Sequence, residues 1–89
     1  MRTLIIVPTF NEAGNIAAAI ERIHTAAPGV DILVVDDMSP DGTGEIADRL
    51  AEADDRISVM HRQGKRGLGP AYLAGFAHGI ESGYDLLVE

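Results

Sequence analysis

Cysteine and tryptophan are absent from this 89-residue chain, and aromatic residues make up only 4% of it. The lack of cysteine excludes disulfide bonds and thiolate zinc sites. Because aromatic rings are scarce, a hydrophobic core must be built mainly from Ile, Leu, Val and Ala. Long apolar runs are also lacking, since the first one, at residues 4–7, is too short for a signal peptide or a membrane span. We therefore expect one small domain that is soluble and cytoplasmic.

Positive charge is scarce as well. The chain has 7 lysines and arginines against 14 aspartates and glutamates, which gives a net charge of −7. This balance argues against nonspecific binding of nucleic acid, and we expect no nucleic-acid partner. Three of the 7 basic residues lie in segment 61–67, which we interpret either as a phosphate contact or as a solvated turn. It is not a P-loop, because the required upstream glycine is missing.

The most informative stretch is residues 32–43, where four apolar residues run directly into Asp36 and Asp37. A continuous run of Ile, Leu and Val predicts a strand buried on both faces, as in a parallel sheet. Ligands of open α/β sheets bind outside the carboxyl ends of the strands. The acidic pair therefore predicts a binding site, although a solvated turn would favour the same residues.

Strand and helix patterns alternate along the chain. Strands are predicted at residues 3–7, 31–35, 57–60 and 84–88. We expect Pro8 to end the first strand, because proline cannot donate to a central ladder. The alternation predicts one α/β domain over residues 1–89, with a Rossmann-like parallel sheet and right-handed crossovers.

Three helices are expected between these strands. Asn11 is the predicted N-cap of the first, which runs to about residue 26, and Thr43 is that of the second. The third begins near Pro70 and is ended by Gly83. Its predicted buried face consists of Leu73, Phe76, Ala77 and Ile80.

A second candidate site segment, residues 8–12, follows the first predicted strand. If the first two strands are neighbours, this segment lies beside the acidic pair. The ring of Phe10 would then pack on a base or a ribose, and Glu12 would accept hydrogen bonds from ribose hydroxyls. The alternative is structural: Phe10 packs at the strand end, and Glu12 is favoured by the dipole of the following helix.

Two other functions have partial support. Residues 42–47 match the dinucleotide-binding pattern G-x-G-x-x-A, but they follow the second strand instead of the first. The acidic pair is also similar to the metal site of a receiver-like signalling module. That module needs an aspartate after the next strand, where this chain has His61 and Arg62. Neither alternative explains the first strand and helix.

Taken together, segments 7–12, 34–43 and 67–72 resemble the amino-terminal half of the family 2 glycosyltransferases. Within that family, the turn Ser-Pro-Asp-Gly-Thr and the motif Gly-Leu-Gly-Pro-Ala-Tyr are similar to those of polyprenol- or dolichol-phosphate mannose synthases. The resemblance implies an inverting transferase with the GT-A fold. It also implies a GDP-mannose donor, a polyprenyl-phosphate lipid acceptor and a divalent metal, Mg or Mn.

The resemblance assigns the nucleotide-sugar site to five positions of this chain. They are Pro8, Phe10 and Glu12, which would hold the nucleoside, and Val35 and Asp37, which would contact the base. A carboxylate can accept from the neighbouring N–H and NH₂ groups of guanine. Relatives usually have Tyr at the position of Phe10, so a hydrogen bond from that hydroxyl is lost here while stacking is kept.

The family's metal-binding Asp-x-Asp motif should follow the strand that ends at Glu89. We therefore expect the chain to be truncated before that motif and inactive alone, with no catalytic residue or metal ligand of its own. Peripheral contact with the cytoplasmic face of a membrane would come from the missing regions. The alternative is a genuine short protein with a binding or structural role.

Overall fold

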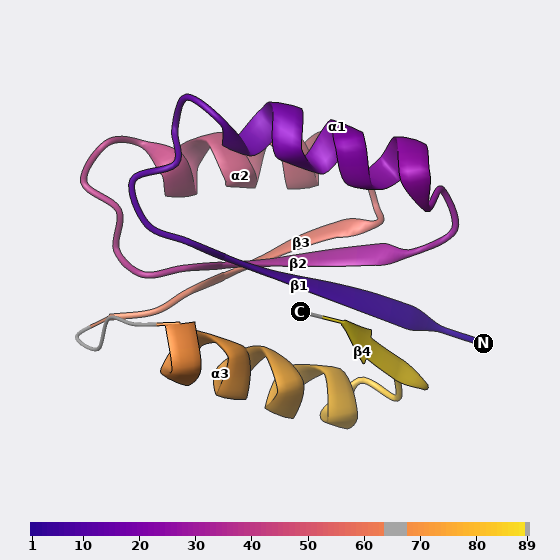
Figure 1. The fold of residues 1–89 in the computed structure, drawn as a ribbon. Helices are drawn as coiled ribbons and strands as arrows, with labels where there is room; N and C mark the ends of the chain where they lie inside the picture. The colour runs from indigo at the N-terminus through magenta and orange to yellow at the C-terminus, as the bar shows by residue number, and fades with distance from the viewer. Residues whose placement is uncertain (64–67, 89) are drawn as a thin grey trace.

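The computed structural model describes residues 1–63 and 68–88, and they form a four-stranded parallel sheet in the order β3-β2-β1-β4 (Figure 1). The strands are β1 (Thr3–Thr9), β2 (Asp31–Asp36), β3 (Ile57–His61) and β4 (Leu86–Val88), and the helices are α1 (Ile16–Ala26), α2 (Thr43–Ala53) and α3 (Leu68–Glu81). The predicted α/β alternation is confirmed.

Helices cover both faces of the sheet: α1 and α2 lie on one face, and α3 lies on the other (Figure 1). The position of β2 between two helical layers explains why its sequence is apolar without interruption. Ile32 and Val34 pack in the core under α1 and α2, whereas Leu33 and Val35 pack in the core under α3. Successive side chains of a strand point to opposite faces, so a strand between two helical layers needs apolar residues at every position.

Pro8 does not end the first strand, which continues to Thr9 with Pro8 paired to Val35. In a parallel strand, successive residues direct their backbone polar groups to opposite neighbours. The carbonyl of Thr9 accepts from β2 through Asp37 N–H, so the preceding residue faces the β4 side. There β4 pairs only with residues 3–5. The missing N–H of proline therefore removes no bond of the described sheet.

The start of α1 also differs from the prediction, because Asn11 is not its N-cap. The helix begins at Ile16, and Asn11 has a positive φ of 56°. The carbonyl of Glu12 accepts from the backbone N–H groups of Asn15 and Ile16 at 2.9 and 2.8 Å. A turn thus separates β1 from the helix. The cap of α2 shifts by one residue, since Gly42 is the N-cap and Thr43 is the first helical residue.

Helix α3 buries a different face from the predicted one. Leu73 and Ile80 are 70% and 71% exposed, and Ala77 is exposed too, whereas Gly75 and Gly79 are buried. Of the four predicted residues, only Phe76 packs against the core. The physical reason is close approach. A Cβ on Gly75 would lie 2.6 Å from Ile6 Cγ2, and one on Gly79 would lie 2.3 Å from Leu87 Cδ2.

Gly83 ends the region of α3 as expected, with a left-handed φ of 81°. Its N–H donates to the carbonyl of Ile80, and Tyr84 N–H donates to that of Gly79, which is the Schellman arrangement. Strand β4 starts at Leu86, two residues later than predicted. Tyr84 instead donates its hydroxyl proton to Asp31 Oδ2 at 2.6 Å and ties this turn to β2.

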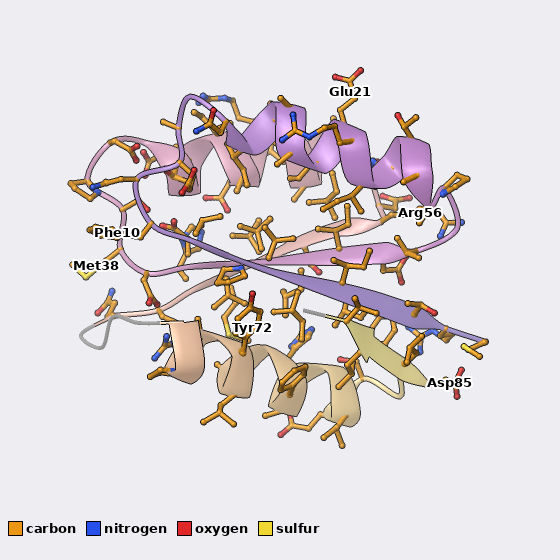
Figure 2. All side chains as sticks on the ribbon, in the orientation of Figure 1. Phe10, Glu21, Met38, Arg56, Tyr72 and Asp85 are labelled. Atoms are coloured by element: carbon orange, nitrogen blue, oxygen red, sulfur yellow. The ribbon has the colours of Figure 1, made fainter. Side chains whose placement is uncertain are left out.

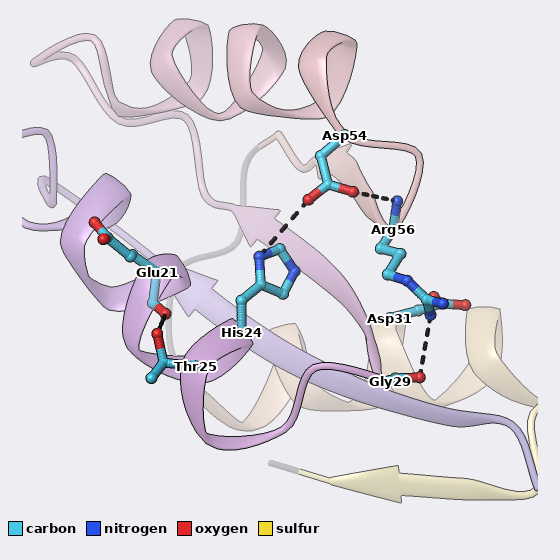
Figure 3. A network of polar contacts seen from close by, with 7 residues as sticks. All are labelled: Glu21, His24, Thr25, Gly29, Asp31, Asp54 and Arg56. Carbon is cyan, nitrogen blue, oxygen red and sulfur yellow. Dashed lines mark hydrogen bonds and ion pairs between the residues drawn. The ribbon is translucent and has the colours of Figure 1, made fainter.

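The amino-terminal edge of the sheet is closed by polar contacts (Figure 3). Arg56 donates to the carbonyl of Gly29 at 3.1 Å, and its backbone N–H donates to Asp54 Oδ1 at 2.9 Å. His24 Nδ1 lies 3.6 Å from Asp54 Oδ2. These contacts join the end of α1 to the turn before β3, so this edge has a structural role.

The bond between Tyr84 and Asp31 predicts a pH effect on stability. Burial and this hydrogen bond raise the pKa of Tyr84 above its usual value of 10.0. The raised pKa means that its stabilisation is present below about pH 10 and is lost as the pH rises through the folded-state pKa. We expect Tyr84→Phe to lower the free energy of unfolding by about 1 kcal/mol at pH 8. Urea unfolding at pH 8 and above pH 10 should show this difference shrinking, and an unchanged difference would contradict it.

Candidate functional site

Asp36, the first member of the acidic pair, is turned into the protein and is 2% exposed. Its carboxylate accepts from Thr9 Oγ1 at 2.7 Å, from Ser39 Oγ at 2.7 Å and from Ser39 N–H at 3.1 Å. These donors satisfy the buried charge and fix the turn that follows β2. The structure therefore gives Asp36 a structural role.

Asp37 lies one residue further on, at the carboxyl edge of the sheet, and is 6% exposed. Its backbone N–H donates to the carbonyl of Thr9 at 3.1 Å. Arg62 donates from its guanidinium to Asp37 Oδ1 at 2.9 Å, and the two side chains are only 16% and 7% exposed. A carboxylate offers about four acceptor positions, and this bond uses one of them. Asp37 is thus a fixed and shielded hydrogen-bond acceptor.

Register explains why Arg62 meets Asp37. Strand β3 pairs with β2 so that His61 lies opposite Asp36. The residues that follow, Asp37 and Arg62, therefore lie side by side. Arg62 N–H donates to the carbonyl of Asp36 at 2.8 Å. Sequence reasoning placed Arg62 in a segment interpreted either as a phosphate contact or as a solvated turn, and it missed this ion pair. Of the other basic residues in that segment, Lys65 and Arg66 lie outside the described residues.

The β1 end supplies the other predicted residues. Phe10 is 36% exposed and lies at the same end of the molecule as Met38, which is 61% exposed (Figure 2). Pro8 and Glu12 are half-buried. The side chain of Val35 is fully buried in the core under α3, so only its main chain remains for contact with a ligand. The strand order makes β1 and β2 neighbours and brings these positions to one edge.

A surface depression of about 440 Å³ lies beside the acidic turn. It is lined by Asp36, Met38, Ser39, Pro40, Glu45, His61, Arg62 and Gln63. Its volume lies within the usual range of small-molecule sites. His61 is held at its rim by Asp48, whose two oxygens lie 2.9 and 3.1 Å from Nε2. Thr9, Ser39 and His61 lie in the candidate segments 8–12, 32–43 and 61–67, but sequence reasoning gave none of them a role of its own; Thr9 and His61 are the last residues of β1 and β3, and Ser39 follows β2.

Across residues 1–63 and 68–88, no group of three or more His, Cys, Asp or Glu side chains is placed to hold an ion. The described part of the chain also contains no helix that is long and apolar enough to cross a membrane.

Known proteins resemble this chain in sequence and in fold. It is 61% identical over 89 residues to the polyprenol monophosphomannose synthase of Mycolicibacterium smegmatis. This match covers 99% of the chain and 34% of that protein. The undecaprenyl-phosphate mannosyltransferase of Micrococcus luteus is 53% identical over 100% of the chain and 37% of its own length. The chain therefore spans about a third of the length of these relatives.

A solved structure gives the same result for the fold. The mannosyltransferase of Pyrobaculum calidifontis, in complex with GDP-Man and Mn2+, matches with a TM-score of 0.76 and 29% identity. The match covers 86% of this chain and 24% of that one. It confirms the predicted fold class, the parallel-sheet half of a GT-A fold. Residues 4–79 match Glycosyl transferase family 2. This chain belongs to the glycosyl transferase family 2.

Proposed function

We propose that this chain carries the nucleotide-sugar-binding part of an enzyme that transfers mannose from GDP-mannose to a polyprenyl phosphate. The observation that carries the proposal is Asp37, a buried carboxylate held by Arg62 at the carboxyl edge of the sheet. The names of the relatives and the GDP-Man bound in the solved neighbour support the donor and acceptor classes.

Recognition of the nucleoside would follow from the side chains at this edge. Guanine presents an N–H and an NH₂ group side by side, and Asp37 accepts from both with the lone pairs that Arg62 leaves. Phe10, which is 36% exposed, would stack on the base. Glu12 accepts from the ribose hydroxyls, while Pro8 and the main chain of Val35 shape the wall behind the base.

In the transfer itself, an oxygen of the acceptor phosphate forms a bond to the anomeric carbon of mannose. The bond from that carbon to the diphosphate breaks, GDP leaves with the electron pair, and the configuration inverts. An ionised phosphate is already nucleophilic, so this chain need supply no general base. A divalent metal, Mg or the Mn that accompanies the solved neighbour, would offset the charge of the leaving diphosphate.

The remaining parts of the activity belong to segments that match the other two thirds of the relatives. We assign to them the metal ligands, the acceptor groove and a peripheral contact with the cytoplasmic face of a membrane. Residues 1–89 are the donor-binding half of the GT-A domain in this proposal.

The chain by itself is expected to transfer no mannose. With GDP-mannose, Mn²⁺ and polyprenyl phosphate, the 89 residues should give no lipid-linked sugar, because no described residues form a metal site. A chimera in which this chain replaces the matching third of the Mycolicibacterium smegmatis relative should be active, given the 61% identity. Chromatography of radiolabelled lipid measures both. Turnover by the chain alone, or an inactive but folded chimera, would contradict the proposal.

A further inference from the structure

Three consecutive backbone amides after β1 are held by side chains of the turn after β2. The bonds run from Asn11 N–H to Ser39 Oγ (3.0 Å), from Glu12 N–H to Thr43 Oγ1 (2.8 Å) and from Ala13 N–H to Asp41 Oδ2 (3.1 Å). We call residues 10–13 the nucleoside loop and residues 39–43 the buckle turn. Each bond spans 28 or 31 positions of sequence, so the contact is tertiary and joins two neighbouring strand ends.

In each of the two hydroxyls of the buckle turn, the direction of the O–H donor is fixed. Ser39 Oγ donates its proton to Asp36 Oδ1 at 2.7 Å, and Thr43 Oγ1 donates to Asp41 Oδ1. A hydroxyl has one proton to give. The lone pairs of each hydroxyl therefore face an amide of the nucleoside loop. Each hydroxyl thus links a carboxylate to that loop by donating to the first and accepting from the second.

The nucleoside loop needs this support because its backbone is not in a relaxed conformation. Asn11 has a φ of 56°, in the left-handed region that non-glycine residues adopt at a cost. Such a conformation persists only when its surroundings determine it. The bonds of the buckle turn act on Asn11 and on the two residues after it, while Phe10 precedes it directly.

Thr43 is the most deeply buried of these three side chains. It is 0% exposed, and it both accepts from Glu12 and donates to Asp41. Asp41 completes the arrangement by accepting from Thr43 N–H at 3.1 Å and from Ala13 N–H. The bonds from Thr43 and Ala13 lower the pKa of Asp41 below its usual 3.8, so it accepts as a carboxylate at neutral pH.

We propose that Ser39, Asp41 and Thr43 are positioning residues, which set the backbone of the nucleoside loop and so aim Phe10 and Glu12 at the nucleoside. This inference rests on the proposed function. It assigns a purpose to the Ser-Pro-Asp-Gly-Thr turn that is separate from ligand contact.

The test is a matched pair of substitutions at Thr43 in the 89-residue chain. Thr43→Val keeps the volume and removes the hydroxyl, whereas Thr43→Ser keeps the hydroxyl. Thr25→Val is the control, because its hydroxyl donates within α1, to the carbonyl of Glu21 at 2.9 Å. Two quantities are measured for each variant: the Kd for GDP by calorimetry, with UDP for comparison, and the hydrogen exchange of the Glu12 amide by NMR.

We expect Thr43→Val to raise the Kd by about fivefold to thirtyfold, because the hydroxyl that accepts from Glu12 and donates to Asp41 is lost and the Glu12 N–H loses this acceptor. Exchange at Glu12 should accelerate by a similar factor. In Thr43→Ser, both quantities should stay within about twofold of their values in the unsubstituted chain. Thr25→Val should change neither. If Thr43→Val does not fold, Asp41→Asn is used in its place, because Asp41 is exposed. The substitution would turn an NH₂ group toward a backbone N–H that the carboxylate had accepted from.

Other results overturn the inference. Unchanged exchange at Glu12 in Thr43→Val would show that the turn does not hold the loop. Accelerated exchange with an unchanged Kd would show that the held conformation does not matter for binding. If the unsubstituted chain binds neither nucleotide, the proposed function fails instead, and the exchange data alone decide whether the turn positions the loop.

Discussion

Asp37→Asn is expected to weaken GDP binding by about tenfold to a few hundredfold. The substitution keeps the shape of the side chain but removes its charge and places an NH₂ group where an acceptor oxygen was. One of the two guanine donors would then face another donor. The loss is large because the position is shielded: the Asp37 side chain is 7% exposed, so water cannot easily satisfy a guanine donor that loses its acceptor there. Calorimetric titration of GDP measures the effect.

Asp36→Asn is the matched comparison, because it makes the same chemical change one residue away. The carboxylate of Asp36 is occupied by Thr9 and Ser39 inside the protein. We therefore expect it to lower the free energy of unfolding by about 1–3 kcal/mol, with a smaller effect on the Kd. Equal and small losses of affinity in the two variants would show that the pair only shapes the turn, and the assignment of Asp37 to the base would be withdrawn.

Gly75→Val is expected to lower the free energy of unfolding by about 3 kcal/mol. An added Cβ would lie 2.6 Å from Ile6 Cγ2 and 3.1 Å from its Cδ1. Ile6 is 1% exposed and branched at Cβ, so it has little freedom to move aside. The gain in helix propensity on replacing glycine, below about 1 kcal/mol, does not offset this overlap.

Gly69→Val is the control in the same helix, since a Cβ there meets nothing within 4 Å. It should leave stability unchanged or raise it slightly. Urea unfolding followed by circular dichroism measures both variants. Equal midpoints for the two would mean that α3 can shift away from β1, and that the close approach of glycine is not required by the fold.

The prediction succeeded where the pattern was local and strongly periodic. Strand β2 follows directly from its uninterrupted apolar run, since all four residues from Ile32 to Val35 are buried in the core. The face of α3 could not be found in this way. The helix has apolar residues on all of its faces. Hydrophobicity therefore favoured Leu73 and Ile80 as buried residues and did not favour Gly75. Close packing across the sheet decided the face.

The candidate site shows the same division. The place of Asp37 at a strand end followed from the sequence, because an apolar run must stop somewhere. Its ion pair with Arg62, 25 residues away, depends on the register between β2 and β3, which the sequence does not state. The roles of Pro8, Phe10, Glu12, Val35 and Asp37 as ligand contacts remain predictions.

Pro8 has a consequence for how the sheet can grow. A strand that pairs with β1 from the β4 side meets donors and acceptors at Leu4 and Ile6, and then a ring nitrogen without a hydrogen at Pro8. Pro8 therefore donates no backbone hydrogen bond on that side, although its carbonyl can still accept one. A neighbouring strand that continued along β1 toward Phe10 would leave one of its carbonyls without a β1 donor, so Pro8 disfavours an extension of the pairing there.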